Sequence, residues 1–257
     1  MRPRIKKLTD ILCFLLLLLS PAAYAATRSL TVAVAANVQF AFKDLQAAFT
    51  RETGINVKAI IGSSGKITAQ VRNGAPFDVF LSADISYPQT LYQGGLASTA
   101  PKIYAYGTLV LWTMNDLDLT PGLKVLADPT VGKVAIANPK LAPYGRAALQ
   151  VLTHYQITDA VRGKTVFGEN VSQVNQYIYS GNVDAGFTAK SVVLSPAMRG
   201  KGTWIEVPQD SYQPIAQGVV ILKHCADHAQ ADCRRFIRFL TSVPARKILA
   251  DYGYNLP

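Results

Sequence analysis

From residue 30 onward, short apolar runs alternate with segments in which apolar residues recur at helical spacing. Residues 30–36 are apolar except for Thr31, which predicts a buried strand. Residues 38–49 carry valine, leucine and phenylalanine on one helical face, and Asn37 stands where an N-cap is expected. The same succession of strand, turn and helix restarts several times along the chain. This alternation predicts an α/β fold.

The remaining elements divide into two groups. Further strands are expected at residues 55–61, 79–81, 134–137, 164–167, 185–188 and 204–207, and further helices at 66–72, 87–93, 146–155, 171–179, 190–195, 229–240 and 244–252. Two longer extended runs, 103–112 and 215–222, separate the groups. We therefore expect two lobes, each a sheet flanked by helices, joined by two crossover strands. Lobe 1 is assigned to residues 26–105 and 213–257, and lobe 2 to residues 106–212.

The first 25 residues have the pattern of a secretory signal peptide. A basic start is followed by the apolar run 12–19 and by Ala23-Tyr24-Ala25, a small–x–small cleavage pattern. An uncleaved membrane anchor is the alternative, although the run is shorter than the roughly 20 residues that span a bilayer. No later apolar stretch approaches that length. We expect a soluble protein exported to the periplasm.

The charge balance is basic, with 26 Lys and Arg against 16 Asp and Glu, a formal net charge of +10. Without the predicted signal peptide the counts are 22 and 15. The basic residues are scattered along the chain, so no nucleic-acid-binding module is expected. A diffuse positive field that attracts small anions is the simpler interpretation.

Two cysteines follow the predicted signal peptide, Cys225 and Cys233. In an oxidising compartment this close pair predicts a disulfide that closes a short loop before the helix expected near Ala229. His224 and His228 lie in the same segment, HCADHAQADC, and a metal site is the alternative. The spacing matches no standard zinc pattern.

Three predicted strand-to-helix junctions are similar, because each has small or hydroxyl residues where a helix begins. They are Ala36-Asn37, Gly62-Ser63-Ser64-Gly65 and Ala142-Pro143-Tyr144-Gly145, and Glu169-Asn170-Val171 is a fourth that carries an acid. Each alone is an ordinary cap or turn. In an open α/β sheet, however, such loops gather at one crevice, where free N–H groups bind anions.

Signatures of catalysis are missing from the sequence, which has no GxSxG, Walker, HExxH or dinucleotide-binding motif. His154 is expected at a helix end in a structural role, and Asp84 as a helix cap. No spacing marks Asp84, Asp184 or Glu169 as a catalytic pair. We expect no catalytic residue.

A resemblance is carried by the three similar junctions together with the segment from Asn73-Gly74-Ala75-Pro76 to Ser82-Ala83-Asp84, the segment Asn138-Pro139 and the C-terminal Tyr252-Gly253-Tyr254. These parts resemble periplasmic molybdate-binding proteins of ABC transporters. The resemblance covers nearly the whole chain after the predicted signal peptide. It implies a two-lobed periplasmic-binding-protein fold of type II that closes on molybdate or tungstate. Molybdenum would then be present only within the bound oxyanion, with no cofactor. The implied partner is an ABC permease in the inner membrane, and we expect a monomer.

By position, the resemblance implies ligands at Asn37 and Ser64 from one lobe, and at the Val171 backbone and Tyr144, through its amide or its hydroxyl, from the other. Ala36 and Ser63 lie beside them. Some members of the family add a tyrosine after the strand at 185–188, where this chain has Ala189, so that ligand is absent. Asn37 stands where many relatives have serine. Asn37 and Ser64 are expected at exposed turn ends.

Two other functions stay open at this point. A receptor for sulfate, phosphate or ferric ion would use the same fold, although the junctions lack the paired tyrosines or carboxylates that iron requires. An exported enzyme on the same two-lobed fold is the second alternative, because fold alone does not determine function.

Overall fold

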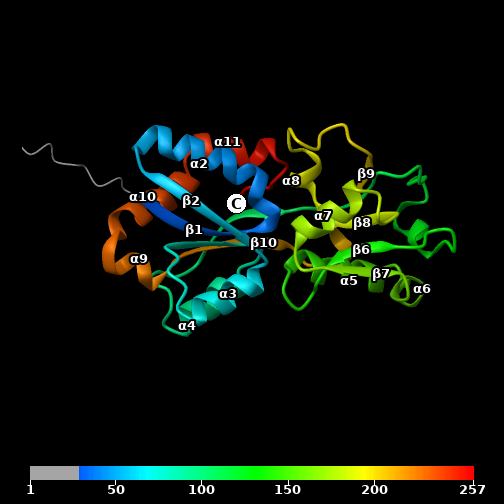
Figure 1. Ribbon diagram of the computed structural model, residues 1–257, viewed down its shortest axis with the longest axis horizontal. Helices are drawn as coiled ribbons and strands as arrows, with labels where there is room; N and C mark the ends of the chain where they lie inside the picture. Colours follow the sequence, from blue (N-terminus) through cyan, green and yellow to red (C-terminus); the bar gives the residue numbers. More distant parts are fainter. Residues whose placement is uncertain (1–28) are drawn as a thin grey trace, which may run out of the picture.

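The computed structural model describes residues 29–257, so the predicted signal peptide lies outside the described residues. Two five-stranded sheets lie side by side, each covered by helices (Figure 1). The strand orders are β2-β1-β3-β10-β4 and β7-β6-β8-β5-β9. The predicted α/β class with two helix-flanked sheets is confirmed. No helix among residues 29–257 is both long and apolar enough to cross a membrane.

The first sheet is mixed. It contains β1 (Ser29–Ala35), β2 (Asn56–Gly62), β3 (Val79–Ser82), β4 (Lys102–Gly107) and β10 (Ile215–Ile221). β1 runs parallel to β2 and β3, whereas β10 runs antiparallel to β3 and β4. The helices that pack on this sheet are α2 (Gln39–Thr53), α3 (Ser64–Arg72), α4 (Ser86–Gln93) and α10 (Gln230–Leu240), and α11 (Val243–Asp251) packs on α2 and α10.

Two apolar cores hold these helices to the first sheet. One joins α2, α10 and α11 to the sheet and includes the rings of Phe49 and Phe236, which meet edge to face with centroids 5.1 Å apart. The other joins α3 and α4 to the sheet through Ile67 and Leu91, which are fully buried. The phenylalanines on one face of the segment 38–49 therefore point into a core, as their helical spacing predicts.

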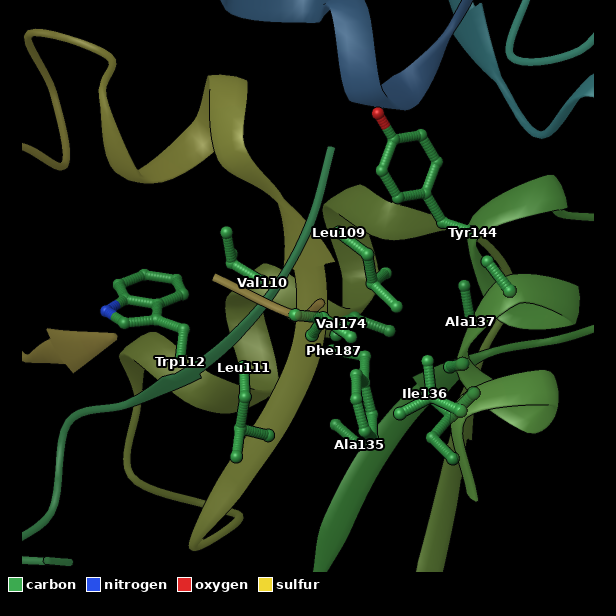
Figure 2. Packing of buried hydrophobic residues seen from close by; sticks show 14 of the residues in the cluster. Leu109, Val110, Leu111, Trp112, Ala135, Ile136, Ala137, Tyr144, Val174 and Phe187 are labelled. Carbon is green, nitrogen blue, oxygen red and sulfur yellow. The ribbon is translucent and has the colours of Figure 1, made fainter. Parts of the chain in front are cut away.

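The second sheet has the same plan. It contains β5 (Leu109–Thr113), β6 (Val134–Ala137), β7 (Thr165–Gly168), β8 (Ala185–Ala189) and β9 (Thr203–Glu206). β6 is parallel to β7 and β8, and β5 is antiparallel to β8 and β9. α5 (Pro143–His154), α7 (Val171–Tyr179) and α8 (Lys190–Val193) pack against it, and α6 (Thr158–Arg162) contacts α5. Leu111, Ile136 and Phe187 lie in its core (Figure 2).

The extended run predicted at residues 103–112 is not one strand. It is divided at Thr108, because β4 pairs within the first sheet and β5 within the second. The chain returns to the first sheet through residues 207–214, which include the short helix η3 (Gln209–Ser211). The C-terminal segment lies against this crossing, where Tyr106 and Asn255 form an isolated β-bridge.

The helix predicted at residues 229–240 is also different in the structure. It is preceded by a separate helix, α9 (Lys223–His228), which the sequence pattern did not predict, and α10 begins at Gln230. α6 and the 3-10 helix η2 (Gly122–Ala127) were not predicted either. These are short elements, and a segment of one or two turns shows too little periodicity to be recognised.

A disulfide joins Cys225 of α9 to Cys233 of α10, with 6.7 Å between their Cα atoms. Both residues are fully buried in the core beneath α2. The bridge therefore links two helices, and the expectation that it closes a loop ahead of a single helix is wrong. The alternative of a metal site in HCADHAQADC cannot use these two sulfur atoms while they are bonded to each other, which leaves His224 and His228 as its ligands.

We expect reduction of this disulfide to lower the free energy of unfolding by about 2–3 kcal/mol, because a closed loop of this length restricts the unfolded chain. The measurement is urea unfolding of oxidised and reduced protein prepared without residues 1–25, which removes Cys13. Because both sulfur atoms are buried, thiols are to be counted by alkylation in denaturant followed by mass spectrometry. Two alkylated cysteines in the untreated protein would contradict the bridge.

Candidate functional site

The sheet register places the predicted junctions in pairs. β1 and β2 are neighbours with Ala35 opposite Gly62, so the residues that follow these two strands lie next to each other. β6 and β7 are likewise neighbours, with Ala137 opposite Gly168. Parallel neighbouring strands end at the same edge of a sheet, and the helices that follow begin there. Each sheet therefore presents two helix starts at one edge.

The two edges face each other across a small cavity of about 10 Å³. This volume is far smaller than the roughly 300–1,000 Å³ that organic ligands occupy. It is lined by all six residues singled out in the sequence, Ala36, Asn37, Ser63, Ser64, Tyr144 and Val171, together with Ala35, Ala83, Ala142, Pro143 and Asn170. The structure thus brings all four junctions to one place.

Backbone N–H groups dominate the chemistry of this cavity. α3 begins at Ser64, α5 at Pro143 and α7 at Val171, and the 3-10 helix η1 (Ala36–Val38) leads into α2. The first N–H groups of a helix have no partner within it, and the helix dipole makes that end positive. Proline has no N–H, so Tyr144 supplies the first one in α5. None of the described residues that line the cavity is charged.

The Ser64 side chain is oriented by the neighbouring junction. Its Oγ accepts a hydrogen bond from the Ala83 N–H at 3.0 Å, and Ser64 is 1% exposed. Because Oγ is already used as an acceptor, its proton is directed elsewhere. Ser63 is the N-cap of α3, where its Oγ accepts from the Lys66 N–H. Ser63 and Ser64 therefore each keep a hydroxyl proton that can be donated to a ligand.

Asn37 does not cap a helix, and that expectation is wrong. α2 begins at Gln39 with Val38 as N-cap, and no side chain bonds to the cap. The Asn37 Nδ2 instead donates to Gln217 Oε1 at 2.8 Å and to the Tyr254 hydroxyl at 3.1 Å. These partners come from β10 and the C-terminal segment, more than 100 residues away. A buried Asn37 amide can reach these distant partners, whereas an amide at an exposed turn could not.

The expectation that Asn37 and Ser64 lie at exposed turn ends is also wrong, since both are 1% exposed. The reason is that the two sheet edges cover each other. Contact across the cavity includes the Ser191 Oγ, which donates to the Asn37 carbonyl at 2.8 Å, and the Gly65 N–H, which donates to the Leu141 carbonyl at 2.9 Å. A Cβ at position 65 would meet the Leu141 backbone at 3.0 Å, so glycine permits this approach.

The rim of the cavity carries side-chain contacts between the same two sides. Lys66 Nζ lies 3.0 Å from Glu169 Oε1, and both side chains are about half exposed. Arg146 pairs with Asp84, and the Ser172 hydroxyl donates to Gln39 Oε1 at 2.8 Å. Exposed ion pairs contribute about 0–1 kcal/mol each. These contacts favour the closed arrangement only weakly.

Tyr144 extends from α5 toward the start of α2 (Figure 2). Its hydroxyl is buried without a hydrogen-bond partner among residues 29–257, and a Cβ at Gly107 would overlap it. Burial raises the pKa of the Tyr144 hydroxyl well above its usual range. The group therefore stays protonated and neutral. The hydroxyl lies against the crossing between the sheets, while the Tyr144 N–H is at the helix start.

Three further residues support the site and were not recognised as part of it from the sequence. The Tyr254 hydroxyl donates to the Asn37 carbonyl at 3.0 Å, and burial raises its pKa. Gln217 donates to the Ala83 carbonyl at 3.1 Å, and Ser191 bonds as described above. Gln217 is a polar residue inside the apolar run 215–222, and this exception to the pattern was the sequence signal that could have marked it as part of the site.

The other residues considered in the sequence lie outside the cavity. His154 ends α5 and is exposed, as expected. Asp84 accepts from the Tyr87 N–H at 3.3 Å in the first turn of α4. Asp184 accepts from the N–H groups of Gly132 and Lys133, each at 2.8 Å. Ala189 is the buried last residue of β8.

The chain is similar to known proteins over nearly its whole described length. Residues 30–255 match the family model described as bacterial extracellular solute-binding protein. The molybdate-binding protein ModA of Azotobacter vinelandii is 38% identical over 240 residues, which cover 93% of this chain and 94% of that protein. The ModA protein of Rhodobacter capsulatus is 38% identical over 231 residues, which cover 90% and 89%.

A solved structure agrees with this assignment. The periplasmic molybdate-binding protein of Azotobacter vinelandii superposes with a TM-score of 0.84 at 36% identity, covering 89% of this chain and 99% of that one. The expectation of a solute receptor and not an enzyme is confirmed by these relatives. On the match of the family model and the identity with these relatives, the chain belongs to the bacterial extracellular solute-binding proteins.

Proposed function

We propose that this protein is an exported receptor that binds molybdate or tungstate and delivers it to an ABC permease in the inner membrane. The observation that carries the proposal is the meeting of four helix starts at one small cavity without a charged lining residue. Such a site suits a small anion held by N–H and O–H donors. Two relatives that are 38% identical carry the name molybdate-binding protein.

We assign the contacts to the anion as follows. Ser64 would donate through its hydroxyl and backbone, and Tyr144 and Val171 through their backbone N–H groups from the opposite side. Asn37 and Ala36 would contribute the N–H groups of η1, with the Asn37 side chain holding that turn in place through Gln217 and Tyr254. Ser63 acts as the cap that orients α3. Hydrogen bonds to a charged partner contribute about 1.5–3 kcal/mol each.

A receptor must also release its ligand, and neutral donors suit this requirement. A fixed cation buried in the cavity would be left without a partner whenever the anion departed, at high cost. N–H and O–H groups can bond to water when the two sides separate. We propose that the sheets with their helices are two lobes, at residues 26–105 with 213–257 and at 106–212, and that they separate at the crossings near Thr108 and residues 207–214.

Sulfate is the second candidate ligand. The sulfate-binding protein SubI of Mycobacterium tuberculosis has a TM-score of 0.73 at 16% identity, which shows a shared fold and nothing of the ligand. The iron-bound HitA of Pseudomonas aeruginosa is alike in fold only, with a TM-score of 0.60. Among residues 29–257, the cavity lining has one tyrosine and no carboxylate, which speaks against ferric ion. Phosphate and an exported enzyme have no observation in their favour.

Export, compartment, oligomeric state and permease partner are proposed from the family. A signal peptide at residues 1–25 would direct export to the periplasm, where the protein would act as a monomer that meets the permease. No cofactor is needed for binding and release. Molybdenum or tungsten would enter the protein only as the metal atom of its oxyanion.

We expect molybdate and tungstate at micromolar concentration to raise the Tm of the ligand-free protein strongly, and sulfate and phosphate to raise it little. Binding to the folded state alone stabilises it, by about 2.7 kcal/mol at a ligand concentration 100 times Kd. The measurement is a thermal-shift panel of tetrahedral oxyanions after refolding to remove bound ligand. Equal shifts with sulfate would move the assignment to the second candidate.

Ser64→Ala is expected to weaken molybdate binding by about 10- to 150-fold, because one donor to a buried anion is lost. Asn37→Ala is expected to weaken it comparably by freeing the η1 turn, and to lower Tm as well, since Asn37 is buried among Gln217 and Tyr254. Calorimetric titration measures both variants. His154→Ala, at the exposed end of α5, is the control with unchanged affinity. Unchanged affinity in both Ser64→Ala and Asn37→Ala would overturn the site.

Tyr144→Phe tests whether Tyr144 binds the anion through its backbone N–H or through its hydroxyl. We expect affinity to change by less than about threefold, or under about 0.7 kcal/mol, because the N–H group is retained. Ligand-free Tm should not fall, since the lost hydroxyl has no partner among the described residues. A loss beyond about tenfold in the same titration would show instead that the hydroxyl is the donor.

A further inference from the structure

A second cluster of polar side chains lies at the other end of the first sheet. Asp78 immediately precedes β3, whereas the cavity lies beyond the carboxyl ends of the parallel strands β1 and β2. His224 and His228 stand one turn apart on α9, which Figure 1 shows on the side of the first sheet away from the second. Ligand atoms of all three residues lie within 4.8 Å of one another.

Asp78 has one oxygen with a partner and one without. Its Oδ2 accepts from the Thr31 N–H at 2.7 Å, which holds the carboxylate in a fixed orientation. Its Oδ1 is buried and has no hydrogen-bond partner within residues 29–257, although the residue is only 3% exposed. A buried carboxylate oxygen without a partner is costly. Oδ1 points toward the two imidazoles, 3.3 Å from His228 Nε2 and 3.9 Å from His224 Nε2.

The backbone determines which nitrogen of His228 is available. His228 Nδ1 lies 2.8 Å from the His224 carbonyl oxygen, an acceptor, so Nδ1 carries a proton and donates. In the neutral imidazole the lone pair is then on Nε2, the atom that faces Asp78 Oδ1. Two lone pairs facing each other at this distance repel unless a cation lies between them. A histidine that donates its other N–H to a backbone carbonyl is the usual arrangement of a metal ligand.

The separations also fit a metal ion. Zn²⁺ binds imidazole nitrogen at 2.0–2.1 Å and carboxylate oxygen at 2.0–2.2 Å in a tetrahedral arrangement, which puts neighbouring ligand atoms about 3.3 Å apart. The 3.3 Å between His228 Nε2 and Asp78 Oδ1 already meets this value, and His224 Nε2, at 3.9 Å, needs to approach the same oxygen by about half an ångström. Both histidine side chains are 45% exposed, so an ion can enter and keep water ligands.

We propose that Asp78, His224 and His228 form a binding site for a divalent transition-metal ion of the Zn²⁺ type, separate from the oxyanion cavity. Two imidazoles and one carboxylate are a set that such ions favour over Mg²⁺ or Ca²⁺. The ion links the start of β3 to α9. The adjacent Cys225–Cys233 disulfide ties α9 to α10, and its bonded sulfur atoms do not serve as thiolate ligands.

The test is zinc binding to oxidised, untagged protein without residues 1–25, near neutral pH and after treatment with chelator. An affinity tag of histidines must be absent, because it binds zinc itself. We expect one Zn²⁺ per chain by calorimetry and a rise in Tm of roughly 5–10 °C at 100 times Kd. Mg²⁺ at the same concentration should give no rise. Absence of zinc binding would overturn the proposal.

Three single variants locate the site. His224→Gln and His228→Gln are expected to weaken zinc binding by more than about 100-fold, since loss of a mere supporting contact costs 10- to 100-fold. His154→Gln, the third histidine of the chain, is the matched control and should bind zinc normally. Because His224 and His228 are half exposed, their variants should fold. Their molybdate affinity should be unchanged, which separates this proposal from the proposed function.

Two results would contradict the assignment. Zinc binding that persists in both His224→Gln and His228→Gln places the ion elsewhere. A second possibility is that Asp78 and His228 form only an ion pair, in which case His228→Gln lowers Tm in chelator while zinc has no effect on the parent protein. Thiols are counted before titration, because reduced Cys225 and Cys233 lie near Asp78 and could bind zinc on their own.

Discussion

Four helices begin at one small cavity, and the N–H groups of their first turns must have a partner. Water can provide it when the cavity is open, but little room is left when the two sheets meet. An anion satisfies several N–H groups at once and matches the positive ends of the helix dipoles. The order of strands, the glycines at the junctions and the contacts of Asn37 all serve to bring these four helix ends together.

The ion pairs between the two sides are weak. Lys66–Glu169 and Arg146–Asp84 are exposed or partly exposed, and each contributes little to closure. The two sides are also joined by the hydrogen bonds from Ser191 to Asn37 and from Gly65 to Leu141. An anion that bonds to both sides adds further hydrogen bonds to the closed arrangement. Under the proposed function, binding and closure are one event, and separation of the two sides also removes the ligand's contacts.

The sequence pattern predicted the parts of the site that depend on neighbouring residues. A strand followed by small residues and a helix is visible in the chain, and parallel pairing then places such junctions together. The role of Asn37 was missed because its partners, Gln217 and Tyr254, arrive from other elements. Burial of Ser64 depends on the opposite lobe. The contact of Asp78 with α9 joins residues about 150 positions apart, which no local pattern records.

The approach of Gly65 to Leu141 limits how far the two sides can move together. Here main chain meets main chain through a hydrogen bond of 2.9 Å, with no side chain between them that could change rotamer. The smallest separation between the two sides is therefore fixed by backbone dimensions. The two sides cannot move closer together around an anion whose bonds are shorter than the cavity fits. Such an anion would leave some of the N–H groups without a hydrogen bond. The fixed backbone spacing would therefore select the ligand by its size.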